Sequence, residues 1–196
     1  MLSPDAIRAR LADVRTVVGE GVTVVAATKY VTLREMAALV DAGVTVVGEN
    51  RAQDLEAKHA EYGDAFRWHF IGHLQSNKVK VLNRICELVH SLDSDSAARR
   101  LEVPALVQVN LSGEASKSGV DPGEIASYLR YDVRGLSTMP PAAGTPEESR
   151  PWFARLRELA AEHGLRELSM GTTQDYAVAA EEGATYVRVG SILFRD

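Results

Sequence analysis

The apolar residues of the chain follow two spacings, one typical of amphipathic helices and one typical of buried strands. Near the start, apolar side chains recur every three or four positions and predict a helix over residues 4–19. Eight short, mostly apolar runs predict strands at residues 23–28, 45–49, 68–72, 87–92, 105–110, 133–137, 167–170 and 186–190. Helical spacing between these runs predicts helices over residues 32–42, 51–62, 77–84, 94–101, 121–131, 147–163 and 175–182.

Eight strands that alternate with helices favour a closed (β/α)8 barrel of the TIM type over an open doubly wound sheet. Strands that are apolar on both faces fit a parallel sheet covered by helices. Only six residues follow Gly190, which leaves no room for a helix after the last strand. We therefore expect the N-terminal helix to cover the gap between the last strand and the first. The length fits a single domain over residues 1–196, with no second domain.

Lys29 directly follows the first predicted strand, and active sites of such barrels lie at the carboxyl ends of the strands. In apolar surroundings desolvation lowers the pKa of a lysine, and the neutral amine can form a Schiff base with a carbonyl. The alternative is a surface lysine whose stem lies on the protein and whose ammonium stays in water.

Glycine and hydroxyl residues follow the last two strands, at Gly171-Thr172-Thr173 and at Gly190-Ser191. These positions match the recurring phosphate site of such barrels, with Thr173 and Ser191 as hydroxyl donors. The alternative is an ordinary helix N-cap by Thr172 or Thr173, with Gly190 in a tight bend. Because strand eight pairs with strand one in a closed barrel, the phosphate site would lie beside Lys29. That combination is what pyridoxal 5′-phosphate (PLP) requires.

Strand alternation places Tyr186 and Arg188 in the barrel if Gly190 points inward. A buried arginine keeps its charge, so it needs a partner. Either Arg188 pairs with Glu49 or another barrel carboxylate, or it faces the ring nitrogen of the cofactor, where a cation weakens the ring as an electron sink. Asn50 and Ser137, which end the second and sixth strands, complete the candidate cofactor-binding residues.

Composition narrows the class of protein further. The net charge of −5 argues against nucleic acid as a partner. The single cysteine, Cys86, cannot form an internal disulfide, so we expect a buried structural thiol and a reducing, cytoplasmic location. No apolar run approaches the ~20 residues that span a membrane, and the first residues lack a signal-peptide pattern.

Two other groups of polar residues invite functional interpretations. We expect His69 to be a packed strand residue and His73 to cap a loop end, rather than either acting as a general base. We expect Asp93 and Asp95 to lie at the start of a helix, where carboxylates interact favourably with the helix dipole, rather than to bind a metal. No set of ligand residues has the spacing of a metal site.

Seven segments occur in an order that resembles the pyridoxal phosphate homeostasis proteins (YggS/PROSC type). They are Ala26-Ala27-Thr28-Lys29, Gly48-Glu49-Asn50, the block from Trp68 to Lys78, Asn110-Leu111-Ser112 with Lys117-Ser118-Gly119, Arg134-Gly135-Leu136, Leu168-Ser169-Met170-Gly171 and Arg188-Val189-Gly190. The resemblance covers nearly the whole chain, and the block from Trp68 to Lys78 is its most specific part.

The resemblance implies a barrel like the N-terminal domain of alanine racemase, with the cofactor on Lys29. It implies phosphate contacts from the Thr173 turn and from Gly190-Ser191, with Arg188 near the ring nitrogen and Asn50 near the ring. Three features depart from the family. Thr172-Thr173 stands where Met-Ser is usual, Ser191 stands where threonine is frequent, and several connections and the C-terminus are shorter.

Three functions remain open at this point. The first is a non-catalytic carrier of PLP. Its expected partners are apo-enzymes that need PLP, and we expect it to be a monomer. The second is a PLP-dependent amino-acid racemase, which needs a second base; Tyr30, Tyr176 and Tyr186 are conceivable. The third is a barrel that binds another phosphorylated metabolite, with Lys29 as an electrostatic clamp.

Overall fold

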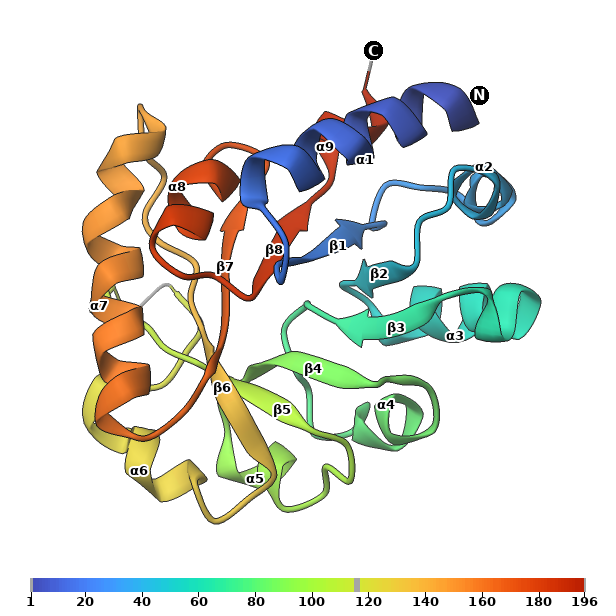
Figure 1. Cartoon of the computed structure of the whole chain (residues 1–196). Helices are drawn as coiled ribbons and strands as arrows, with labels where there is room; N and C mark the ends of the chain where they lie inside the picture. Colours follow the sequence, from blue (N-terminus) through green and yellow to red (C-terminus); the bar gives the residue numbers. More distant parts are fainter. Residues whose placement is uncertain (1, 115–116, 196) are drawn as a thin grey trace.

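Eight parallel strands form a closed barrel in chain order, as predicted (Figure 1). The computed structural model describes residues 2–114 and 117–195, so the outermost residues of the predicted 1–196 domain lie outside it. The strands are β1 (Thr23–Ala27), β2 (Val46–Glu49), β3 (Arg67–Phe70), β4 (Leu88–Leu92), β5 (Ala105–Gln108), β6 (Val133–Ser137), β7 (Glu167–Thr172) and β8 (Tyr186–Val189).

The barrel closes where β1 pairs with β8 in parallel register, from Thr23 opposite Tyr186 to Ala26 opposite Val189. This pairing removes both edges of the sheet, which an open doubly wound sheet would leave exposed. It also brings the first and last strands of the chain side by side, so that the segments following β1 and β8 meet at one end of the barrel.

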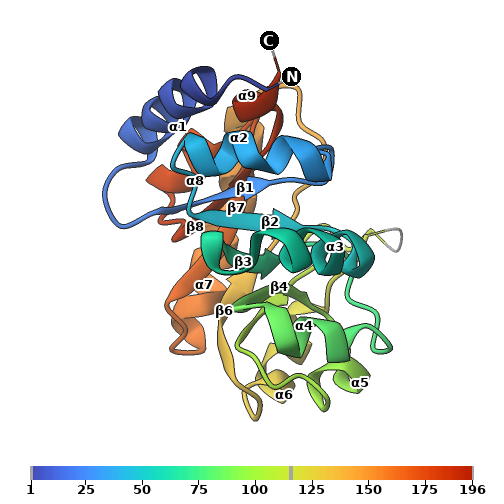
Figure 2. The same cartoon turned by 90° about the vertical axis from the view of Figure 1, so that its right-hand side faces the viewer.

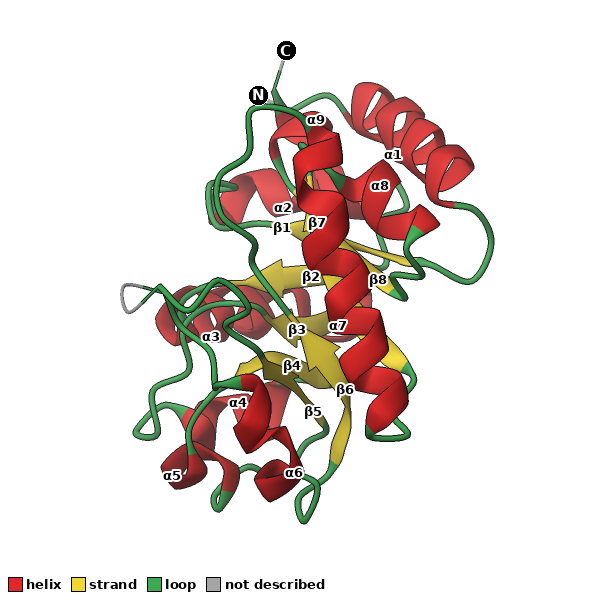
Figure 3. Ribbon diagram, turned by 90° about the vertical axis from the view of Figure 1, so that its left-hand side faces the viewer, coloured by secondary structure: helices red, strands yellow, loops and turns green. Residues whose placement is uncertain are grey.

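Helices cover the outside of the barrel. They are α1 (Pro4–Val18), α2 (Met36–Asp41), α3 (Ala52–Tyr62), α4 (Val79–Ile85), α5 (Asp95–Ala98), α6 (Ile125–Tyr128), α7 (Arg150–Glu162), α8 (Tyr176–Glu181) and α9 (Ser191–Phe194). Figure 2 shows α2, α3 and α4 following one another along the outside of β1 to β4. Figure 3 shows the long helix α7 on another side of the barrel, where it contacts β6 and β7.

The N-terminal helix covers the gap between the last strand and the first, as expected from its apolar face. It contacts α8, α9 and α2 (Figure 1). Its buried residues are Ile7, Leu11, Val14 and Val18, which have the three- and four-residue spacing that predicted the helix. Ser3 caps the helix, since its Oγ accepts the N–H of Ala6, and Pro4 occupies the first helical position.

Three helical segments differ from the sequence-based boundaries. The segment predicted at 94–101 is one turn, α5, and the segment predicted at 121–131 is a 3-10 turn (Pro122–Glu124) followed by α6. Pro122 and Gly123 favour that tight turn, and Asp121 accepts the N–H of Gly123 at 2.8 Å. The expectation that no helix follows the last strand is wrong in detail, because α9 forms a single turn directly after Gly190.

Candidate functional site

A cavity of about 640 Å³ lies at the carboxyl ends of β1, β2, β7 and β8. Six of the seven residues predicted for cofactor binding line it: Lys29, Asn50, Thr173, Arg188, Gly190 and Ser191. The volume is within the roughly 300–1,000 Å³ typical of small-molecule sites. We call it the Lys29 cavity. Barrel closure therefore gathers residues from both ends of the chain around one space.

Ser137 is the seventh predicted residue, and the structure does not bring it to the cavity. It is buried at the end of β6, and its hydroxyl donates to the backbone carbonyl of His90 in β4. Strand alternation explains the difference, since a residue at a strand end can point into the barrel body rather than toward the cavity.

Lys29 lies in a turn just beyond β1, and its side chain is exposed. Its Nζ lies 4.5 Å from the centroid of the Tyr30 ring, a cation–π contact. The expectation of a lysine desolvated in apolar surroundings is therefore wrong, because the turn lifts Lys29 clear of the buried strand. The amine is accessible and lines the cavity, which are the two properties that a covalent attachment site needs.

Beneath Lys29, a buried ion pair fixes the ends of β1 and β2. Glu49 is fully buried and pairs with Lys58 of α3, which also donates to the carbonyl of Thr28 at 2.9 Å. The Thr28 hydroxyl donates to Glu49 Oε1 at 2.6 Å, and the N–H of Asn50 donates to Glu49 Oε2 at 3.2 Å. The network therefore anchors Thr28, which precedes Lys29, and Asn50 itself.

Arg188 lies in the floor of the Lys29 cavity and is 8 % exposed. Of the two alternatives for Arg188, the pairing with Glu49 does not form, since Lys58 occupies that carboxylate. Nη1 donates to the carbonyl of Ser169 at 2.9 Å and to its hydroxyl, while Nη2 donates to the carbonyl of Thr138 and to Met139 Sδ, both at 2.9 Å. Burial lowers the pKa of Arg188 to about 10, against the raising effect of Asp175, so it stays charged at neutral pH.

The turn after β7 is built differently from a threonine N-cap. Asp175 is the N-cap residue of α8, and its carboxylate accepts the N–H and the hydroxyl of Thr172. Thr173 Oγ1 accepts the N–H of Gly190 at 3.2 Å, so its own proton remains available to an acceptor. Gly171 has a φ of +90°, and a Cβ there would lie 2.5 Å from Ala179 Cβ of α8. Only glycine fits this turn.

Asn50 is held against the segment after β3. A Cβ on Gly72 would lie 1.9 Å from the Asn50 carbonyl oxygen, so the two backbones touch at this point. Asn50 Oδ1 is buried and has no hydrogen-bond partner within residues 2–114 and 117–195. A buried amide oxygen without a hydrogen-bond partner costs free energy, so most buried polar groups in folded proteins are paired. It marks a position where a polar ligand atom would be accommodated.

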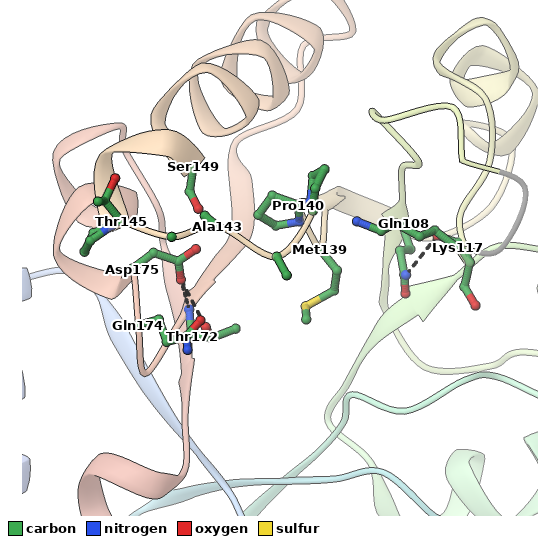
Figure 4. A pocket seen from close by; sticks show the side chains of 15 residues that line it. Gln108, Lys117, Met139, Pro140, Ala143, Thr145, Ser149, Thr172, Gln174 and Asp175 are labelled. Carbon is green, nitrogen blue, oxygen red and sulfur yellow. Dashed lines mark hydrogen bonds between the residues drawn. The ribbon is translucent and has the colours of Figure 1, made fainter.

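A second cavity, of about 700 Å³, adjoins the first and shares Met139, Thr172 and Gln174 with it. The loop that follows β6 forms much of its wall, from Met139 to Pro146. In the view of Figure 4, Met139 lies between the Thr172 side of this space and the Gln108 side. Met139 therefore lines both cavities, and its sulfur accepts a hydrogen bond from Arg188.

Sequence reasoning missed several residues of the site. Lys58 had a readable signal, because Ala52, Leu55 and Lys58 recur every three positions on the buried face of α3. A lysine on an apolar helix face predicts a buried carboxylate partner. Met139 had no comparable signal, since its place depends on how the loop after β6 crosses the barrel end.

The remaining polar candidates are not at the Lys29 cavity. Cys86 is buried, and burial raises the pKa of its thiol to about 12, as fits a structural thiol. His73 is exposed, with Nδ1 3.7 Å from Asp93 Oδ2 and 3.5 Å from Ser118 Oγ. Ser94 precedes α5, and its side chain makes no capping hydrogen bond.

Neither a metal-binding cluster nor a membrane-spanning helix is found in the described part of the chain. The groups of histidine, cysteine, aspartate and glutamate there do not form a set that could hold a metal ion. None of its helices combines the length and the apolar character that crossing a membrane requires.

Two buried histidines lie inside the barrel body, below Arg188. His69 of β3 is 1 % exposed, as a packed strand residue should be, and His90 of β4 is 2 % exposed. Burial lowers the pKa of His69 to about 4. Burial, together with the charges of His69 and Arg188, lowers the pKa of His90 well below its usual value. Both imidazoles are therefore neutral at physiological pH.

Comparison with known proteins identifies the family. The family of alanine racemase N-terminal domains matches residues 2–196. The pyridoxal phosphate homeostasis protein of Aquifex aeolicus is 41% identical over 177 residues, which cover 79% of this chain and 78% of that protein. The one from Pseudomonas aeruginosa is 40% identical over 172 residues, covering 78% and 75%. The chain belongs to the pyridoxal phosphate homeostasis protein family.

Solved structures agree with this family assignment. PipY from Synechococcus elongatus, whose structure is known with PLP bound, has a TM-score of 0.87 and 34% identity to this chain, and the match covers 96% of this chain and 99% of PipY. Lysine/ornithine decarboxylase from Vibrio vulnificus has a TM-score of 0.75 at 16% identity, covering 98% of this chain and 62% of the decarboxylase. At that identity the likeness shows the barrel fold alone.

Replacing Lys58 tests the buried pair beneath the site. In Lys58→Met, the Glu49 carboxylate stays buried without its cation, so we expect the free energy of unfolding to fall by roughly 3–5 kcal/mol in urea titrations. The double variant Glu49→Gln/Lys58→Met should regain most of that loss, because no unpaired charge remains. The exposed pair Glu56–Arg84 provides the control: Arg84→Met should cost less than about 1 kcal/mol. A Lys58→Met protein as stable as the wild type contradicts the pairing.

Mild acid should destabilise the barrel through His69 and His90. Their folded pKa values lie below the ordinary value of about 6.5. The stability that neutral burial provides is therefore complete above pH 6.5 and is lost as the pH falls toward about 4, the pKa of folded His69. Each histidine lowers the free energy of unfolding by up to about 1.4 kcal/mol per pH unit. Urea unfolding between about pH 6.5 and 5 measures this slope. Replacement of the exposed His73 by Gln should leave it unchanged, whereas a flat wild-type profile would disprove neutral burial.

Proposed function

We propose that the protein binds PLP as a Schiff base on Lys29 and acts in intracellular PLP homeostasis, buffering or delivering the cofactor. The observation that carries this proposal is the single cavity that Lys29, Arg188 and the Thr173–Ser191 hydroxyls line together. An amine, a ring-facing cation and a phosphate-binding turn are the three features that PLP recognition requires. The family membership and the PLP-bound PipY structure support the same conclusion.

The unpartnered polar groups of the cavity fit the polar groups of PLP. Arg188 has four of its five N–H groups engaged, and its Nε has no partner within the described residues. That donor suits a ring nitrogen. The free hydroxyl proton of Thr173 suits a phosphate oxygen, and the buried Asn50 Oδ1 lies where a ring substituent could meet it.

PLP supplies an electrophilic aldehyde that condenses with a lysine amine. In our proposal Lys29 provides the amine, and its exposed position makes attachment and release both accessible. Thr173 and Ser191 hold the phosphate, with Gly190 in the turn beside them, and Asn50 contacts the ring. Arg188 keeps its own proton and donates a hydrogen bond, so the ring nitrogen remains unprotonated and the ring is a poor electron sink.

We further propose that the protein retains PLP without turning over a substrate. A racemase needs a second base opposite the lysine. Tyr186 packs against His69 and His90 in the barrel body, and Tyr176 does not line the Lys29 cavity. Tyr30 does line it, but it adjoins Lys29 in the same turn. The family name of the relatives, homeostasis protein, supports this view.

The remaining parts of the proposal concern the setting of the protein. Apo forms of PLP-dependent enzymes are the proposed recipients of the cofactor. The proposed location is the cytoplasm, because the buried free thiol of Cys86 is compatible with a reducing compartment. The proposed unit is a single barrel domain that acts as a monomer.

Lys29→Ala should abolish covalent attachment of PLP. The wild-type protein mixed with PLP is expected to be yellow, and borohydride reduction followed by peptide mass spectrometry should find the cofactor on Lys29. The visible Schiff-base band should be absent in Lys29→Ala and intact in Lys80→Ala, which removes an exposed lysine of α4. Survival of the band in Lys29→Ala disproves the attachment site. A colourless wild-type protein carrying another phosphorylated ligand would favour the electrostatic-clamp alternative.

Incubation of the PLP-loaded protein with L-alanine and with D-alanine in heavy water distinguishes a carrier from a racemase. We expect no deuterium at Cα above the rate of free PLP, because none of the three candidate tyrosines lies opposite Lys29 as a second base. An alanine racemase under the same conditions is the positive control. Exchange at an enzymatic rate, followed by mass spectrometry or NMR, would overturn the non-catalytic assignment.

A further inference from the structure

Four polar side chains form a continuous chain of hydrogen bonds through the barrel body, from Arg188 to His69. Arg188 Nη1 donates to Ser169 Oγ, Ser169 Oγ lies 2.7 Å from His90 Nδ1, and His90 Nε2 lies 2.9 Å from His69 Nδ1. Ser169 is in β7 and His90 is in β4, strands that are not neighbours in the barrel. Their contact therefore crosses the interior of the barrel.

The donor and acceptor capacities of these groups set one direction for the chain. Arginine N–H groups only donate, so Ser169 Oγ accepts from Arg188. The Ser169 proton then has His90 Nδ1 as its acceptor. His90 must carry its own proton on Nε2 and donate it to His69 Nδ1. His69 in turn carries its proton on Nε2.

The reverse direction leaves more polar groups unsatisfied. If His90 Nδ1 donated to Ser169 Oγ, the serine proton would have no acceptor among the described residues, and His69 Nε2 would be an unpartnered lone pair. In the direction derived above, only the N–H at His69 Nε2 lacks a hydrogen-bond partner there. The cation of Arg188 also favours the lone pair of His90 Nδ1, rather than an N–H, on its side of the chain.

We propose that Ser169, His90 and His69 are positioning residues that hold the Arg188 guanidinium in one orientation, with its Nε–H toward the ligand in the Lys29 cavity. Ser169 engages both protons of Nη1, one through its carbonyl and one through its hydroxyl. Its hydroxyl is itself held by His90. The inference rests on the proposed binding of PLP, since it assigns a role in presenting a donor to the ring nitrogen.

The two histidines of this chain of hydrogen bonds are uncharged, which leaves Arg188 as its cation. Burial holds the pKa of His69 at about 4, and the pKa of His90 is well below its usual value. Neither imidazole therefore competes with Arg188 as a cation facing the cavity from within the barrel. Tyr186 packs edge-on against both rings and keeps its own proton, since burial raises its pKa to about 12.

Nitrogen-15 NMR of histidine-labelled full-length protein tests the direction without any substitution. Before and after loading with PLP, His69 and His90 should both be neutral, with the proton on Nε2 and an unprotonated Nδ1. A proton on Nδ1 of His90, or a charged imidazole at neutral pH, overturns the proposal. Because this spectrum needs no bound cofactor, it reports on the chain even if PLP does not bind.

Ser169→Ala tests the positioning role, with Ser91→Ala as the matched control. Ser91 is a buried serine next to His90 in β4, and its hydroxyl has no partner within the described residues. Loss of a hydrogen bond to the charged guanidinium should weaken PLP binding by about tenfold in Ser169→Ala. The nitrogen-15 resonance of ring-labelled PLP should move as well, whereas Ser91→Ala should match the wild type. Ser169→Thr, which keeps the hydroxyl, should restore both signals.

The outcomes separate this inference from the proposed function. Wild-type protein that fails to bind PLP contradicts the proposed function alone. Wild-type protein that binds PLP, together with a Ser169→Ala variant of unchanged affinity and unchanged ring-nitrogen resonance, overturns the positioning role. A Ser169→Ala variant that loses thermal stability but keeps its PLP affinity and its ring-nitrogen resonance also overturns the positioning role. A purely structural serine would give that result, because it would not affect the ring nitrogen.

Discussion

The pairing of β1 with β8 is the constraint on which the rest of the site depends. Lys29 follows β1, while Arg188 lies in β8 and Thr173 and Ser191 lie just beyond β7 and β8. Neither group could form a binding site alone, because an amine without a phosphate site or a phosphate site without an amine does not recognise PLP. Closure joins them, and α1 stabilises the junction from outside through α8 and α9. The N-terminal helix α1 therefore stabilises the part of the barrel where residues from both ends of the chain line the Lys29 cavity.

Two buried polar networks, rather than apolar side chains alone, hold the cavity walls in place. One joins Glu49 and Lys58 beneath the ends of β1 and β2, and the other runs from Arg188 into the barrel body. Barrel interiors are usually filled by layers of branched apolar residues. Burying charge is costly unless each group is satisfied, so these networks contribute more to the precision of the site than to the stability of the fold.

The contrast between Lys29 and Arg188 fits a reversible carrier. Lys29 is exposed in a turn, whereas Arg188 is buried and fixed by at least three neighbours. In the proposed function, the accessible amine allows attachment and release of PLP, and the rigid cation leaves the ring nitrogen unprotonated, which makes the ring a poor electron sink. Catalysis by the same scaffold would need a second base aimed at the cofactor, and the described tyrosines do not provide one at a position facing Lys29.

Apolar periodicity alone determined the strand order, the closed barrel and the face of α1 that is buried, because these features follow from local spacing and from the rule that parallel strands are covered by helices. The positions of polar residues at the strand ends, together with the resemblance of seven motifs, predicted six residues that do line the cavity. Contacts between distant segments decided the rest. The exposure of Lys29, the pairing of Glu49 with Lys58 instead of Arg188, and the turn of Ser137 toward His90 all depend on how strands and loops pack in three dimensions. A sequence specifies which groups are present and their local spacing, but the partner of a buried charge is chosen by geometry that only the folded barrel contains.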